Sequence, residues 1–142
     1  EEMLASDDAR IRSYRPHPVS HDEAMEVLRG AAEAGLVHLA YVGKDSKDGK
    51  IGTICSCCSC CCENLGSILR FGMAPHLLKA SAYTSTDESR CTGCGACEDR
   101  CHFGARKIKD GALTFDKSRC YGCGLCVGTC PTSAISIIQQ HQ

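Results

Sequence analysis

The apolar and polar positions in the first part of the chain predict an irregular lead-in followed by one helix. Residues 1–19 have no regular period, and their prolines disfavour a helix. Ser20 and Glu23 form the S-x-x-E pattern of a capping box, so a helix is expected to begin here. Apolar residues then recur at helical spacing: Ala24, Val27, Leu28 and Ala31. Gly35 is the expected end of this helix.

The pattern beyond the first helix predicts a strand, a loop and a second helix. The apolar run at 36–42 indicates a buried strand, and the charged, glycine-containing stretch at 43–52 an exposed turn or hairpin loop. A helical period returns at residues 63–71. The connector at 73–90 is expected to pack through two leucines, Leu77 and Leu78.

From residue 91 the chain repeats itself. Cysteines at 91, 94, 97 and 101 recur 29 residues later at 120, 123, 126 and 130. Asp110 and Gly111, the strongest short hairpin signal, separate two apolar stretches at 106–108 and 112–115. Each copy therefore predicts a cysteine loop, a short helix and a strand.

The composition is unusually rich in cysteine, with 14 cysteines among 142 residues. They cluster at 55–62, 91–101 and 120–130, whereas the cysteines of secreted disulfide scaffolds are usually spread to join distant loops. Short, fixed spacings favour metal sites in a reducing compartment, so we expect a cytoplasmic protein. The formal net charge of −1, without a basic tract, gives nucleic-acid binding no electrostatic support. No apolar run is long enough for a membrane span.

The doubled C-x2-C-x2-C-x3-C spacing is typical of two [4Fe–4S] clusters, in which the fourth cysteine of each run ligates the other cluster. A zinc ribbon would require neither the third and fourth cysteines of each run nor the second run. The expected ligands of one cluster are Cys91, Cys94, Cys97 and Cys130. The expected ligands of the other are Cys120, Cys123, Cys126 and Cys101. The fourth cysteine is expected at the start of the following helix.

Residues 91–137 resemble a bacterial-type two-[4Fe–4S] ferredoxin. The resemblance implies an α+β, ferredoxin-like pseudo-twofold fold and one-electron transfer. Cys130 is followed by Pro131, as in the family's motif, but Cys101 is followed by His102. A surface substitution is the preferred interpretation of His102, and a proton-coupled tuner of the cluster potential is the alternative.

Six further cysteines form a denser motif, C-x-C-C-x-C-C-C, which is not a ferredoxin spacing. They are Cys55, Cys57, Cys58, Cys60, Cys61 and Cys62. The preferred interpretation is a third metal site that uses about four of these thiolates, as an iron–sulfur cluster or with zinc. A redox-active dithiol, local disulfides and simple packing are the alternatives, although a bridge between adjacent cysteines would be strained. His76 is a weak candidate ligand.

This dense motif, together with the two runs, resembles a group of poorly characterised 4Fe-4S dicluster proteins of anaerobic prokaryotes. The similarity extends from about residue 20 to 137 and implies a role in anaerobic metabolism. Members of that group often carry a further N-terminal part. Because this chain does not begin with methionine, we expect it to be part of a longer chain or larger complex.

The sequence therefore predicts an electron-transfer module with three parts. Residues 1–19 form the lead-in, 20–90 a helix–strand unit containing the dense cysteine segment (54–62), and 91–142 the two-cluster domain. Two ligated clusters, at roughly −2 each, make the protein anionic and favour a redox partner with a basic docking surface. A reductase whose dense site does chemistry and a redox or metal sensor are the alternatives. No catalytic residue is assigned.

Overall fold

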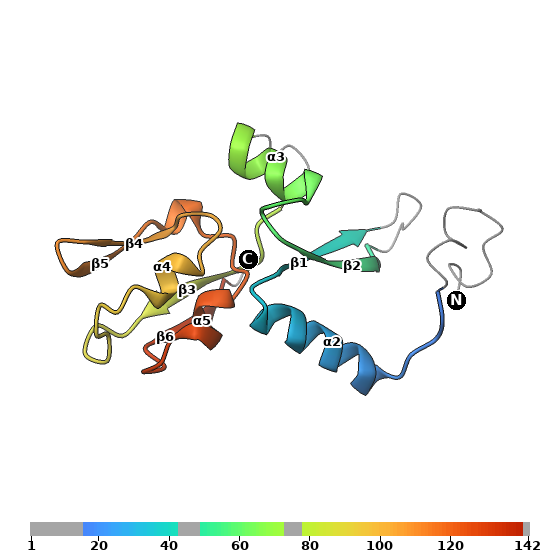
Figure 1. The fold of residues 1–142 in the computed structure, drawn as a ribbon, viewed down its shortest axis with the longest axis horizontal. Helices are drawn as coiled ribbons and strands as arrows, with labels where there is room; N and C mark the ends of the chain where they lie inside the picture. The colour runs from blue at the N-terminus through green and yellow to red at the C-terminus, as the bar shows by residue number, and fades with distance from the viewer. Residues whose placement is uncertain (1–15, 43–48, 73–77, 141–142) are drawn as a thin grey trace.

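A computed structural model of the chain describes residues 16–42, 49–72 and 78–140, in which short helices accompany three two-stranded antiparallel sheets. Figure 1 shows the N-terminal helix and hairpin on one side of the molecule and the repeated half on the other, with α3 above the junction. Within the described residues, no helix is both long and apolar enough to cross a membrane. Most of the lead-in, part of the expected 43–52 loop, Leu77 and His76 lie outside the described residues.

Helix α2 (His21–Glu33) begins at the expected capping box. The Glu23 amide donates to Ser20 Oγ at 3.2 Å, and the Ser20 amide donates to Glu23 Oε2 at 2.7 Å. Gly35 follows the helix with a left-handed φ of 88°. The expected apolar face is only half-buried, and Val27 is exposed.

Strands β1 (Val37–Val42) and β2 (Ile51–Cys57) form an antiparallel hairpin. The expectation of a buried strand at 36–42 is correct only for Val37 and Leu39, because the other positions of β1, Tyr41 included, are exposed. β2 begins inside the expected loop and extends into the dense cysteine segment. Its pairing places Cys57 opposite Val37 and Cys55 opposite Leu39.

Helix α3 (Glu63–Phe71) has the predicted bounds. Cys62 is its N-cap, and the Leu65 amide donates to Cys62 Sγ at 3.4 Å. Gly72 ends the helix in the left-handed conformation, with φ 66°. The expected packing of Leu78 is wrong, since this side chain is 92% exposed.

The repeated half is built from short elements: β3 (Ala82–Thr86), α4 (Ala96–Asp99), β4 (Arg106–Lys109), β5 (Ala112–Phe115), η1 (Lys117–Arg119), α5 (Leu125–Thr129) and β6 (Ile135–Gln139). β4 and β5 form the predicted hairpin, in which Asp110 and Gly111 both have positive φ. The sequence interpretation missed β3, which pairs with β6 across the whole repeat. A strand on the N-terminal side of the predicted 90/91 boundary is thus hydrogen-bonded to the last strand of the repeated half.

One apolar core joins the two halves of the molecule. Its buried members come from both sides: Val37, Leu39, Cys57, Leu65, Phe103 and Leu125. Cys101 and Tyr121 pack against this core, as do Cys55 and Cys62. The inner cysteines of the dense segment therefore share a core with residues of the second cysteine run.

Candidate metal centres and the dense cysteine segment

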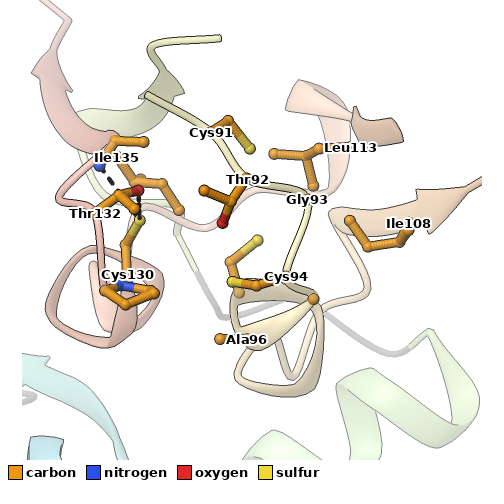
Figure 2. A pocket seen from close by; sticks show the side chains of 14 residues that line it. Cys91, Thr92, Gly93, Cys94, Ala96, Ile108, Leu113, Cys130, Thr132 and Ile135 are labelled. Atoms are coloured by element: carbon orange, nitrogen blue, oxygen red, sulfur yellow. Dashed lines mark hydrogen bonds between the residues drawn. The ribbon is translucent and has the colours of Figure 1, made fainter. Parts of the chain in front are cut away.

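The folded repeat surrounds one pocket with the first three cysteines of the first run and the last cysteine of the second run. The side chains that line this first cysteine pocket include Cys91, Cys94, Cys97 and Cys130. Figure 2 draws the sulfurs of Cys91, Cys94 and Cys130 around the pocket, with Ile108, Leu113 and Ile135 as apolar walls.

A second pocket gathers the complementary set of thiols. Its lining includes Cys101, Cys120, Cys123 and Cys126. Phe103 and Tyr121 stack beside these thiols with ring centroids 4.3 Å apart, and both line the pocket. The structure thus brings together the same two sets of four that the sequence predicts as ligands.

The fourth cysteine of each run follows a short helix, so the expectation that it begins one is wrong. Cys101 lies two residues beyond α4, and Cys130 is the C-cap of α5. The amides of Ala105 and Ala134 donate to the sulfurs of Cys101 and Cys130, each at 3.3 Å. Each fourth sulfur therefore receives an N–H bond from the same position of the repeat, and such bonds help to set the potential of an iron–sulfur cluster.

The repeat extends further towards the N-terminus than the cysteines do. Asp87, Ser89 and Arg90 precede the first run as Asp116, Ser118 and Arg119 precede the second. Each aspartate accepts hydrogen bonds from its serine: the hydroxyl is at 2.6 Å in both copies, and the amide is at 3.0 Å in the first and 2.9 Å in the second. Hydrogen bonds from the serines lower the pKa of both carboxyls. The matching turns therefore position the first cysteine of each run in the same way.

The two arginines of these turns connect the copies. Arg90 Nη2 donates to the Thr132 carbonyl at 2.7 Å, and Arg119 Nε donates to the Phe103 carbonyl at 3.0 Å. Thr132 lies two residues after Cys130, as Phe103 lies two residues after Cys101. Each arginine therefore binds the backbone beside the cysteine that the opposite copy contributes to its pocket.

A buried arginine stands among the two sets of thiols. Arg106 is only 1% exposed and donates to the hydroxyls of Thr84 at 2.8 Å and Thr86 at 2.7 Å. Its Nε is buried with no protein partner, and no carboxylate pairs with it among the described residues. A buried cation without a counter-ion is costly, so the site calls for negative charge.

The thiols near Arg106 also fit anionic clusters. Arg106 lines the second pocket, while in the first pocket burial raises the pKa of Cys97 and Arg106 opposes that rise. Within the described residues, neither pocket has three sulfurs that all lie within 4.8 Å of one another. One zinc ion, with Zn–S of about 2.3 Å, would hold its sulfurs closer than this, whereas a four-iron cluster spreads its ligands. The residues present therefore fit [4Fe–4S] clusters.

The dense cysteine segment separates into two sets. The inner set is Cys55, Cys57 and Cys62. Cys57 is 3% exposed and donates its thiol to Cys55 Sγ at 3.1 Å. Burial raises the pKa of Cys57, whereas the Leu65 amide at the start of α3 lowers that of Cys62. This inner set packs in the apolar core.

The outer set occupies the turn between β2 and α3. Cys58 and Cys60 form a disulfide, and Cys61 Sγ lies 3.1 Å from Cys58 Sγ. The ligand atoms of these three residues all lie within 4.8 Å of one another, so in the reduced state they could hold one metal ion. The Cα atoms of Cys58 and Cys60 are 5.4 Å apart, because Ser59 separates them; strain was expected for directly adjacent cysteines.

His102 ties the dense segment to the second pocket. Its Nδ1 lies 3.2 Å from Ser59 Oγ, and its Nε2 lies 2.8 Å from the Gly35 carbonyl oxygen. The ring is half-buried, so the preferred interpretation of a plain surface substitution is wrong. A proline after Cys101 could make neither contact. The departure from the ferredoxin motif at this position is the signal in the sequence that could have indicated the connection.

Comparison with known proteins supports this description of the repeated half. Residues 90–134 match the family model of a 4Fe-4S dicluster domain. This domain implies two [4Fe–4S] clusters and an iron–sulfur electron-transfer module. No curated protein matches the chain.

Proposed function

We propose that this protein carries single electrons between redox partners through two [4Fe–4S] clusters. One cluster is held by Cys91, Cys94, Cys97 and Cys130. The other is held by Cys101, Cys120, Cys123 and Cys126. The observation that carries the proposal is the exchange between the copies, in which each pocket takes three thiols from one run and the fourth from the other. A bound cluster supplies one-electron chemistry, and the chain supplies ligands, insulation and charge.

The chain's own residues are suited to this task. Phe103 and Tyr121 cover part of the second pocket with aromatic surface, and exclusion of water is one of the factors that tune a cluster potential. Gly93 has φ 66°, and a Cβ there would approach the Gly111 carbonyl oxygen to 2.9 Å. The cysteine loop therefore runs close to the β4–β5 turn and can be tight only with glycine at this position.

The charge and the thiols of the protein indicate the kind of partner it binds and the compartment in which it works. With two clusters bound, the formal charge falls from −1 to about −5, which favours a partner with a basic docking surface. Free thiols and clusters of this kind favour the cytoplasm and an anaerobic metabolism. The dense segment is a third metal or redox site in this proposal.

Metal analysis of anaerobically purified protein tests the proposal. We expect about eight iron atoms and eight sulfides per chain, with the signals of reduced [4Fe–4S] clusters in electron paramagnetic resonance. Cys130→Ser should disturb the cluster held by Cys91, Cys94 and Cys97, and Cys101→Ser the cluster held by the first three cysteines of the second run, although Cys130 ends the second run and Cys101 the first. Disturbance of the cluster held by the same run would contradict the ligand exchange.

The Cys58–Cys60 disulfide favours one alternative, a reductase in which the dense segment does chemistry. Disulfides in reducing compartments are usually transient, either catalytic or redox-sensing. This alternative keeps both clusters and adds a terminal acceptor for their electrons.

A further inference from the structure

We infer that the Cys58–Cys60 bridge is a reducible disulfide that takes electrons from the two clusters and passes them to a disulfide of a partner. The inference rests on the proposed two-cluster function. It assigns Cys58 and Cys60 of the outer set to thiol–disulfide exchange and leaves the inner set as their buried support.

The bridge lies where a partner can reach it. Cys60 is exposed, while Cys58 and Ser59 are half-buried. Arg70 on α3 donates to the carbonyls of Ser59 at 3.4 Å and Cys60 at 3.0 Å, which fixes the turn and places a positive charge beside it. A nearby cation favours the thiolate, which is the attacking species in exchange.

The bridge is also connected to the second cysteine pocket. Ser59, the residue between the bridged cysteines, lies 3.2 Å from His102 Nδ1, and His102 directly follows Cys101. Beneath the turn, Cys57 packs in the same apolar core as Cys101. One hydrogen bond and a short stretch of backbone therefore lead from a cluster ligand to the disulfide.

The number of electrons that the disulfide needs equals the number that the two clusters can store. The sulfur–sulfur bond of Cys58 and Cys60 breaks on accepting two electrons and two protons, and two thiols form. Two clusters store one electron each, so one fully reduced chain holds the pair that the bond requires. A low-potential one-electron donor protein reduces the clusters again, and solvent supplies the protons. Electron transfer from the clusters to the disulfide is thermodynamically favourable, because ferredoxin-type clusters are commonly stronger reductants than protein dithiols.

The second half of the cycle is exchange with the partner. The exposed Cys60 thiolate attacks one sulfur of the partner's disulfide, a mixed disulfide forms, and the first partner thiol leaves. Cys58 then attacks Cys60 in the mixed disulfide, the second partner thiol leaves, and the Cys58–Cys60 bond is restored. The net result is transfer of two electrons from the clusters to the partner.

A reductive titration of the anaerobic, cluster-loaded full chain tests the first half. The oxidised wild type should accept roughly four electrons, two in the clusters and two in the bridge, whereas the Cys58→Ser/Cys60→Ser double variant should accept roughly two. Glu63→Gln is the matched control, because it changes an exposed residue beside the turn and leaves the bridge and every thiol intact; it should match the wild type. Maleimide labelling followed by mass spectrometry should find Cys58 and Cys60 free only after reduction.

The outcomes separate this inference from the proposed function. An iron-replete wild type that stops at about two electrons would overturn the inference alone. So would labelling of Cys58 and Cys60 before reduction, or one firmly bound zinc or copper ion in the turn. A third iron–sulfur cluster, with about twelve iron atoms per chain, would also overturn it. Protein that binds no iron under anaerobic reconstitution would overturn the proposed function and the inference together.

A turnover assay with hydroxyethyl disulfide as the probe tests the second half. With a photoreduced flavin as electron donor, the wild type should release thiol from the probe at least tenfold faster than the double variant. Both proteins must show equal cluster signals. Equal rates would overturn the exchange with a partner.

Discussion

Arg90 donates from Nη2 to the carbonyl oxygen of Thr132 at 2.7 Å, and it thereby joins the turn before the first cysteine run to the backbone just after Cys130. The corresponding contact in the other copy joins Arg119 to Phe103 at 3.0 Å. These two contacts hold the ends of the repeat in the arrangement that completes both pockets.

Replacement of either arginine by leucine should loosen the pocket that the arginine serves. Arg90→Leu should speed iron loss from the first pocket, and Arg119→Leu from the second, each by severalfold, because the fourth cysteine loses its anchor. Iron release to a chelator, followed in visible absorbance, measures the rates. Arg29→Leu, on the exposed face of α2, is the control. Equal rates in all three variants would contradict the anchoring role.

Arg106 should raise the potentials of the clusters. Its buried positive charge favours the more negative, reduced state, so Arg106→Met should lower at least one potential by tens of millivolts. Potentiometric titration followed by electron paramagnetic resonance measures the change. Arg106→Lys keeps the charge and should shift the potentials less.

The control for Arg106 is its exposed neighbour Lys107. Lys107→Met removes the same formal charge where water screens it, so the cluster potentials should hardly move. If the two methionine variants shift the potentials equally, burial of Arg106 has no special effect.

His102→Ala should destabilise the junction between the two halves. The variant loses the contacts with Ser59 and the Gly35 carbonyl, and two hydrogen bonds are together expected to contribute about 1–3 kcal/mol to the free energy of unfolding. Denaturant unfolding of the cluster-loaded protein under anaerobic conditions measures the loss. His21→Ala is the control, because the His21 side chain is 85% exposed. A loss no larger than that of the control would disprove the structural tie.

The turns before the cysteine runs should give the protein a pH dependence on the acid side. Hydrogen bonds from Ser118 lower the pKa of Asp116 from its ordinary value of 3.8. The ionised carboxylate therefore contributes its full stabilisation above that ordinary value, and the contribution is lost as the pH falls through the lowered pKa. Asp116→Ala removes the acceptor, so the second cluster should be lost at a higher pH than in the wild type.

Stepwise acidification followed by visible absorbance measures this effect. Asp110→Asn is the control, because it also removes one carboxylate but suits the positive φ of 51° at the β4–β5 turn. Cluster loss at the same pH in both variants would show that the Asp116 hydrogen bonds do not protect the site.

The sequence was most informative where a local chemical rule applied. The capping box at Ser20, the bounds of α3 and the Asp110–Gly111 turn all follow from short-range patterns, and each is confirmed. The two sets of pocket cysteines likewise follow from their spacing, although their assignment as cluster ligands stays a prediction.

The sequence was less informative where pairing is long-range. β3 contains hydroxyl-bearing residues rather than an apolar run, and it becomes a strand because β6 and the hydroxyl bonds of Arg106 support it. Its signal was the second copy of the repeat, since residues 82–91 align with 111–120 once Asp87 and Asp116 are matched. The contacts of Arg106 and His102 depend on partners far away in sequence; the missing proline after Cys101 marks His102 as unusual but does not reveal what it contacts.

The exchange of elements between the copies also bears on how the protein is loaded with iron. β3 pairs with β6 and β4 with β5, so each sheet of the repeated half takes one strand from each copy, as each pocket takes cysteines from both. Ordering one pocket therefore orders part of the other. Binding of the first cluster should therefore offset most of the conformational entropy that is lost when the pockets become ordered, so the second cluster binds to a site that is already arranged. At partial iron supply, chains with two clusters should outnumber chains with one.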